Sequence, residues 1–345
     1  MTSPLFEPRF YERAAQRYLA QLAAAPVWVN VPWGLTGNPA NRPEVDGIWT
    51  HEGRMIAAEI KAHRVGRDTA EEILAKYRDL GFRDLIVIAP SFAPAAVNCL
   101  TGSSRLPVVE PVPFTPSLGA IEEFYRGDWQ RGVPDWVHAT LASGLHHVRF
   151  MLTVPSVTGH VVVGQRRTRI YDTAAITRAI AALPSPPARV LWTPQRFTIP
   201  RDLIARRSHV TALGGYIPVD IDGDRLHAAN HACQLIPEQA SCPHCLRYAL
   251  REYARLRQAL GDAQWVEVLF SGGRGIHAYL CGGQQQRARL LKVATERRLR
   301  IDTAVTASVK TTISLPGSLH AATTHAVMPL GQAGQATPAA MVITC

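Results

Sequence analysis

Two aspartates separated by one residue are the first candidates for chemistry in this chain. A strand over residues 216–221 would direct the carboxylates of Asp220 and Asp222 to one side, while Val219 and Ile221 point into a core. Two carboxylates so close together stay ionised when cations neutralise them, and Mg²⁺ or Mn²⁺ suits such hard oxygen ligands. The spacing therefore indicates a two-metal site, although an Asp-x-Asp before a glycine is also typical of a solvated strand end.

A glycine-rich hairpin is the second candidate, because it can hold an anion. Residues 265–270 and 276–280 read as strands, and Ser271-Gly272-Gly273-Arg274-Gly275 joins them. The glycines leave backbone amides open to an anion, and Arg274 can donate two hydrogen bonds to phosphate oxygens. His277 begins the returning strand. The hairpin therefore predicts a phosphate-binding cradle.

Cysteine and histidine residues cluster between the aspartates and this hairpin. A Cys-x-x-Cys pair with a His and a Cys shortly before it is typical of a closed structural zinc site. A redox dithiol would normally open a helix and would not need the upstream pair. The predicted zinc ligands are His231, Cys233, Cys242 and Cys245, with His227 or His244 as alternatives for the histidine. We expect Zn²⁺ to stabilise an insertion over about residues 227–247.

One more acid and a serine-histidine pair complete the candidate site residues in this part of the chain. Asp302 follows a basic amphipathic helix predicted over residues 285–299, so it is either a third metal ligand or the solvated end of that helix. Ser318 and His320 end the segment Leu315-Pro316-Gly317-Ser318-Leu319-His320.

The order of these motifs resembles that of the archaeo-eukaryotic primase superfamily, which includes small catalytic primase subunits and primase-polymerases. The resemblance covers about residues 120–330 and implies a mixed α/β (α+β) catalytic core with an RRM-like half. The implied ligands of two Mg²⁺ or Mn²⁺ ions are Asp220, Asp222 and Asp302. The residues that it implies for binding the incoming nucleoside triphosphate are Ser271, Arg274, His277, Ser318 and His320.

The nucleotide pocket departs from the pattern of that superfamily. Ser314 stands six positions before His320, where a basic residue is common in the superfamily, and Ala321-Ala322-Thr323 lacks the usual lysine. Lys310 is a candidate substitute for the missing charge.

A second site is predicted near the N-terminus. Residues 45–49 and 55–60 are expected to form a hairpin on which Glu59 and Lys61 face the same way, with Asp46 across from them. The carboxylates could hold Mg²⁺ while the ammonium positions or activates an attacking water. A surface hairpin with an ordinary Glu–Lys pair is the alternative.

This hairpin, with a helix before it and a helix (68–80) and buried strand (84–89) after it, resembles the PD-(D/E)XK, or restriction-endonuclease-like, superfamily. The resemblance covers about residues 5–100, although the proline that usually precedes the first acid is displaced to Pro43. It implies a metal-dependent nuclease that uses Asp46, Glu59 and Lys61, or an inactive DNA-binding relative of that fold.

The chain is therefore expected to contain two domains. A nuclease-like domain would span residues 1–106 and a primase-like domain residues 119–345. Residues 107–118 contain four prolines without a helical or strand period, which is typical of a linker.

The distribution of charge points to a polyanionic partner. The net charge is +10, and Lys and Arg balance Asp and Glu up to residue 115, so the whole excess lies in residues 116–345. A basic surface confined to one domain favours nucleic acid. The cluster Gln165-Arg166-Arg167-Thr168-Arg169 contributes to it. No apolar run reaches membrane-spanning length and no signal peptide is evident, so we expect a cytoplasmic protein without membrane contact.

Together these patterns predict a template-dependent nucleotidyltransferase that makes or extends primers on single-stranded DNA, fused to a possible nuclease. Expected partners are nucleoside triphosphates, the single-stranded DNA template, and a helicase or an accessory primase subunit. The alternatives are a gap-filling repair polymerase, a catalytically silent DNA-binding module, and a nuclease that the primase-like domain targets to its substrate.

Overall fold

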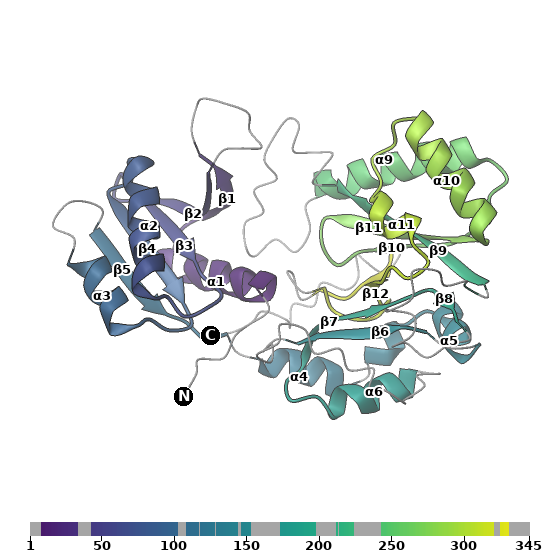
Figure 1. Cartoon of the computed structure of the whole chain (residues 1–345), viewed down its shortest axis with the longest axis horizontal. Helices are drawn as coiled ribbons and strands as arrows, with labels where there is room; N and C mark the ends of the chain where they lie inside the picture. The colour runs from purple at the N-terminus through teal and green to yellow at the C-terminus, as the bar shows by residue number, and fades with distance from the viewer. Residues whose placement is uncertain are drawn as a thin grey trace.

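The structure, a computed structural model, is mixed α/β and contains three sheets in its described part (Figure 1). This agrees with the α+β class predicted from the sequence. The described residues are 8–33, 43–102, 108–116, 118–127, 129–143, 146–152, 173–197, 212, 214–223, 243–320 and 325–330. No helix in these ranges is long and apolar enough to cross a membrane.

The strands of the first sheet follow one another in space as they do along the chain. They are β1 (Trp28–Pro32), β2 (Glu44–His51), β3 (Arg54–Ile60), β4 (Asp84–Ala89) and β5 (Val108–Pro113). β1, β2 and β3 pair antiparallel, whereas β3, β4 and β5 pair parallel. Parallel neighbours need a crossover, and α2 (Arg67–Asp79) and α3 (Pro94–Thr101) provide both. The predicted hairpin, helix and buried strand are confirmed.

Helices cover both faces of this sheet, which explains why β4 is apolar from Leu85 to Ala89. Leu85 and Val87 join the buried cluster of α2 and α3, whereas Ile86 and Ile88 join that of α1 (Pro8–Ala23). A strand buried on both faces reads as a continuous hydrophobic run.

The linker predicted over residues 107–118 is wrong for residues 108–113, which form β5. In the described part β5 lies at an edge of its sheet, where a proline costs less because one side of the strand has no neighbour to pair with. Phe114 follows β5 and is buried, with its ring stacked 4.6 Å from that of Tyr18 in α1. The packed N-terminal unit therefore extends beyond residue 106.

A three-stranded sheet opens the second half, in the order β12-β7-β6. Its strands are β6 (Val148–Leu152), β7 (Pro187–Trp192) and β12 (Ile313–Ser314), with α6 (Thr173–Ala181) between the first two in the chain. The helical stretch before β6 is divided into α4 (Gly119–Arg126), a 3₁₀ turn (Trp129–Gly132) and α5 (Asp135–Ala142).

The third sheet carries the aspartates. Its order is β13-β10-β11-β9-β8, all antiparallel. These strands are β8 (Gln195–Arg196), β9 (Gly214–Asp222), β10 (Trp265–Phe270), β11 (Gly275–Cys281) and β13 (Met328–Pro329). Helices α9 (Pro243–Leu260) and α10 (Gln284–Glu296) pack with the inward side chains of β9 and β11, and the short α11 (Thr303–Ala307) lies beside β9 (Figure 1).

One apolar cluster includes residues from both predicted domains. Tyr11 and Trp49 come from the N-terminal unit, and Trp192 and Leu319 from the C-terminal one. The two halves therefore share one continuous buried cluster.

Candidate functional site

β9 positions Asp220 and Asp222 as the sequence predicted. Val219 and Ile221 are completely buried, while the Asp220 side chain keeps 17% of its surface exposed. The alternation arises because successive side chains of a strand point to opposite faces. Both aspartates therefore lie on the side of β9 away from its apolar core.

Asp302 lies next to Asp220 although many elements separate the two residues in the chain. The Asp302 N–H donates a 2.8 Å hydrogen bond to the Asp220 carbonyl. Asp302 also caps α11, because its Oδ1 accepts hydrogen bonds from the N–H groups of Ala304 and Val305. Thr306 attaches the same helix to β9 through a 3.2 Å bond from Oγ1 to the Pro218 carbonyl.

The chemistry of these three acids suits Mg²⁺ or Mn²⁺, but their side chains do not form a preassembled cage. Carboxylate oxygens are the ligands that both ions prefer. Among the described residues, no three His, Cys, Asp or Glu side chains form a group that could hold a metal ion. Binding would therefore require the side chains to turn, with the main chain already bringing Asp302 to Asp220.

The glycine-rich loop adjoins the end of the aspartate strand. Gly275 is the cross-strand partner of Asp222, and the Gly223 N–H bonds to the Arg274 carbonyl at 3.1 Å. A Cβ at Gly275 would overlap the carbonyl oxygen of Ile221, so this close approach requires glycine. The Ser271 hydroxyl accepts hydrogen bonds from the amides of Gly273 and Gly275, so Ser271 holds the loop in shape.

His277 lies directly opposite Asp220 on β11 and is 1% exposed. Its Nε2 is 3.8 Å from Oδ1 of Asp220. Burial, reinforced by the charge of Arg189, lowers the pKa of His277 to about 3, so the imidazole is neutral at ordinary pH. Its position favours contact with the Asp220 carboxylate rather than electrostatic binding of a phosphate.

Ser318 and His320 occupy different surroundings. The buried Ser318 hydroxyl lies 2.7 Å from the Leu315 carbonyl and 3.2 Å from the Val190 carbonyl, so it holds its own loop against β7. The His320 ring lies over the glycine-rich loop. A Cβ added at Gly273 would be 3.3 Å from Nε2 of His320. The structure thus brings His320, but not the Ser318 hydroxyl, to the predicted cradle.

Sequence reasoning missed Arg189 of β7. Its Nε donates a 2.6 Å hydrogen bond to Oγ of Ser314, which is fully buried on β12. A signal was present, since Arg189 is the one charged residue of an otherwise apolar strand.

The predicted zinc site falls largely outside the described residues. Three of the predicted ligands lie outside the described ranges, namely His231, Cys233 and Cys242. Cys245 is buried in the first turn of α9, and a Cβ at Gly223 would overlap its carbonyl oxygen. The last predicted zinc ligand therefore packs directly against the residue that follows Asp222.

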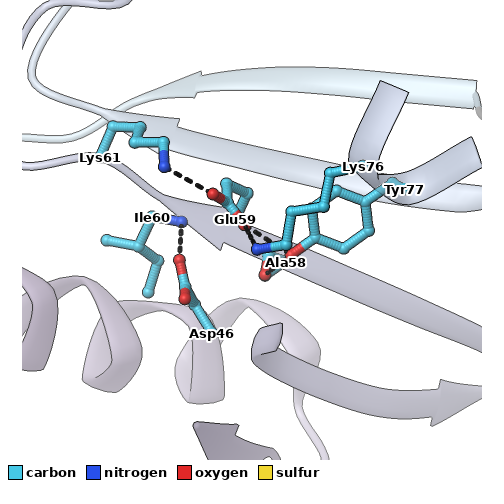
Figure 2. A network of polar contacts seen from close by, with 7 residues as sticks. All are labelled: Asp46, Ala58, Glu59, Ile60, Lys61, Lys76 and Tyr77. Atoms are coloured by element: carbon cyan, nitrogen blue, oxygen red, sulfur yellow. Dashed lines mark hydrogen bonds and ion pairs between the residues drawn. The ribbon is translucent and has the colours of Figure 1, made fainter. Parts of the chain in front are cut away.

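The N-terminal hairpin brings together Asp46, Glu59 and Lys61 (Figure 2). Glu59 is 3% exposed, and its Oε1 accepts a 2.6 Å bond from Lys61. Its Oε2 accepts bonds of 2.7 Å from both Lys76 and Tyr77 of α2. Oδ2 of Asp46 accepts a 2.6 Å bond from the Ile60 N–H. The three predicted residues and two unpredicted ones thus form one polar network.

The two acids of this network differ in charge. Burial, together with the neighbouring Glu59 carboxylate, raises the pKa of Asp46 to about 8. Burial alone would also raise the pKa of Glu59, but the ammonium groups of Lys61 and Lys76 hold it below its usual value. At neutral pH the network therefore contains a protonated Asp46 beside an ionised Glu59. Such a divided pair is typical of functional sites.

Helix α1 supplies further polar groups beside Asp46. Gln16 is 1% exposed, and its Nε2 donates to Oδ1 of Asn30 at 2.8 Å and to the Asp46 carbonyl at 3.4 Å. Its longer contact with Glu12 Oε1, at 3.4 Å, places a third carboxylate near the network. These α1 residues were not predicted, because Gln16 meets Asp46 only through the packing of α1 against β2 and β3, which is a tertiary contact.

No protein-family model matches this chain, and no curated protein matches it.

Proposed function

We propose that the C-terminal half is a template-dependent nucleotidyltransferase, a primase or primase-polymerase, that acts on single-stranded DNA. The observation that carries this proposal is the contact between Asp302 and Asp220, with His277 opposite Asp220 and the glycine-rich loop at the end of the same strand. Acids and an anion cradle that lie far apart in sequence meet at one end of β9. Nucleotidyl transfer needs both of these parts at one place.

In this proposal each residue has a distinct task. Asp220, Asp222 and Asp302 would hold Mg²⁺ or Mn²⁺, which would lower the pKa of the attacking hydroxyl and stabilise the leaving pyrophosphate. The loop amides and Arg274 bind the triphosphate, Ser271 shapes the loop, and His277 orients Asp220. His320 covers the loop, and the basic surplus of residues 116–345 holds the template.

Primer synthesis on single-stranded DNA with labelled nucleotides and Mg²⁺ or Mn²⁺ tests the proposal. Asp220→Asn should lower product formation by at least about a hundredfold. Asp262→Asn is the matched control, because Asp262 is exposed and pairs with Arg289 away from β9. Products started from two free nucleotides identify a primase, whereas extension of a supplied primer alone identifies a gap-filling polymerase. Equal activity of Asp220→Asn and the wild type would leave only a DNA-binding role.

We infer a second function, a metal-dependent nuclease, for the N-terminal network. What supports it is the convergence of Asp46, Glu59 and Lys61, whose carboxylates could hold Mg²⁺ while Lys61 positions water. DNA cleavage in Mg²⁺ should fall at least about a hundredfold in Glu59→Gln and Lys61→Ala. The controls are the exposed Glu52→Gln and Lys292→Ala. A wild type that binds DNA without cutting it would make this unit a DNA-binding relative of the nucleases.

A further inference from the structure

Both oxygens of the buried Glu59 carboxylate accept hydrogen bonds from ammonium groups, and the two ammonium groups come from different elements (Figure 2). Lys61 directly follows β3 and donates to Oε1 at 2.6 Å. Lys76 lies in the last turn of α2 and donates to Oε2 at 2.7 Å. A metal ion bound to either oxygen of Glu59 would therefore lie beside an ammonium group.

An ion on Oε2 would compete with Lys76. Mg²⁺ binds carboxylate oxygens at about 2.0–2.1 Å, so the ion and Nζ of Lys76 would be close neighbours of like charge. In a site withdrawn from water such a repulsion is much stronger than in bulk solvent. Oε2 can therefore hold the ammonium or the metal ion, but not both at once.

The surroundings of Oε2 allow Lys76 to leave. Its side chain keeps 29% of its surface exposed, so the ammonium can move into water. The Tyr77 hydroxyl, which is 2.7 Å from the same Oε2 and 2.9 Å from the Ala58 carbonyl, would still hold the carboxylate in place. Lys61 is equally exposed, but the proposed nuclease needs its ammonium beside the attacking water.

We propose that Lys76 is a resident cation that Mg²⁺ or Mn²⁺ must displace from Glu59, so that Lys76 sets the metal concentration at which the N-terminal site is loaded. This inference rests on the metal-dependent nuclease function proposed above and adds its regulation. A buried carboxylate without a partner is costly, and Lys76 neutralises Glu59 until the metal arrives. The exchange replaces one cation with another, so Glu59 is neutralised in both states.

Mn²⁺ binding by the full chain, measured by titration calorimetry, tests the proposal without relying on cleavage. All proteins carry Asp220→Asn, which removes one ligand of the other proposed metal site. Lys76→Gln should bind Mn²⁺ about tenfold or more tightly than this parent, because the competing charge is gone. Lys76→Arg keeps the charge and should stay within about twofold of the parent. The matched control is Arg78→Gln, which removes an exposed cation from the same turn of α2 and should change nothing.

Further measurements separate competition from a structural role. A purely structural Lys76 predicts equal or weaker metal binding once it is replaced, since the carboxylate would lose support. Adding Glu59→Gln to Lys76→Gln should abolish the gain in affinity. DNA cleavage by Lys76→Gln should reach half of its maximum rate at an Mn²⁺ concentration at least about fivefold below that of the parent. Lys76→Met is a second neutral variant, and all are compared at a temperature where their circular dichroism matches that of the parent.

The outcomes distinguish this inference from the function on which it rests. Unchanged or weaker Mn²⁺ binding in Lys76→Gln and Lys76→Met, with binding lost in Glu59→Gln, overturns the role of Lys76 and leaves the metal site standing. A gain that persists in the double variant, or that arises in Lys61→Gln instead, also overturns it. If no variant binds Mn²⁺ through Glu59, the metal-dependent nuclease fails and the role of Lys76 fails with it.

Discussion

Asp302 is joined to Asp220 through the main chain, by a hydrogen bond from the amide of one to the carbonyl of the other. This bond makes the separation of the two carboxylates depend on where α11 sits. Thr306 and the buried Arg287 determine that position, since Thr306 bonds to β9 and the Arg287 guanidinium donates to the Thr306 carbonyl.

Thr306→Val tests the attachment of α11 to β9. The substitution removes the bond to the Pro218 carbonyl, so we expect the free energy of unfolding to fall by about 1 kcal/mol. Primer extension should then need more Mg²⁺, because Asp302 is held less firmly. Thr295→Val is the control, since the exposed Thr295 hydroxyl bonds only within its own helix. An unchanged Mg²⁺ requirement would show that Asp302 does not depend on this bond.

Gly275→Ala tests the close approach of the glycine-rich loop to β9. A methyl group there would overlap the Ile221 carbonyl oxygen, and moving two paired strands apart should cost about 2 kcal/mol or more. Chemical denaturation measures the loss. Gly283→Ala is the control, because nothing lies within 4 Å of its added Cβ. Equal stability of the two variants would contradict the tight packing described for β9 and β11.

The raised pKa of Asp46 should make the free energy of unfolding fall as the pH rises. Its pKa is raised to about 8, so the folded state keeps a proton that the unfolded chain releases near its usual value of 3.8. Between about pH 4 and pH 8 the free energy of unfolding should decrease by at most about 1.4 kcal/mol per pH unit from this group. Asp46→Asn should flatten the profile in that window, while the exposed Asp79→Asn should not. Glu59 affects stability in a different pH range. Because folding lowers the pKa of Glu59, the stability that it contributes is lost only as the pH falls below 4.5, its value in the unfolded chain.

Lys76→Met tests whether Lys76 stabilises the buried Glu59 carboxylate. Removing one of two ammonium partners should lower the free energy of unfolding by about 1–3 kcal/mol and raise the pKa of Glu59. Lys292→Met is the control, because Lys292 is exposed and its nearest ion-pair oxygen, on Glu296, is 3.9 Å away. A thermal melt of each variant at pH 7 makes the comparison, and equal losses would assign Lys76 no special role.

Elements with a strong local pattern could be predicted from the sequence. One is the alternation of buried and polar side chains around Asp220, and another is the strand-helix-strand pattern whose first strand contains Glu59. Both depend on residues that are neighbours in the sequence, and both are confirmed. β5 was missed because its prolines oppose a strand, and its place at a sheet edge follows only from the tertiary structure.

The missed site residues have a different cause. Lys76 and Tyr77 lie on a helix whose orientation over Glu59 is set by packing, and Arg189 meets Ser314 only through pairing of β7 with β12. The resemblance of the motif order to that of the primase superfamily implied that Asp302 would approach Asp220. It could not indicate that Asp302 would also cap a helix, or that His277 would be buried.

The contact of Gly223 with Cys245 also governs how the chain can vary. Gly223 follows Asp222 at the end of β9, and Cys245 lies in the first turn of α9, so this contact holds the start of α9 beside the end of the aspartate strand. Any larger residue at position 223 would have to push α9 or the glycine-rich loop away from Asp222, so the contact restricts this position to glycine.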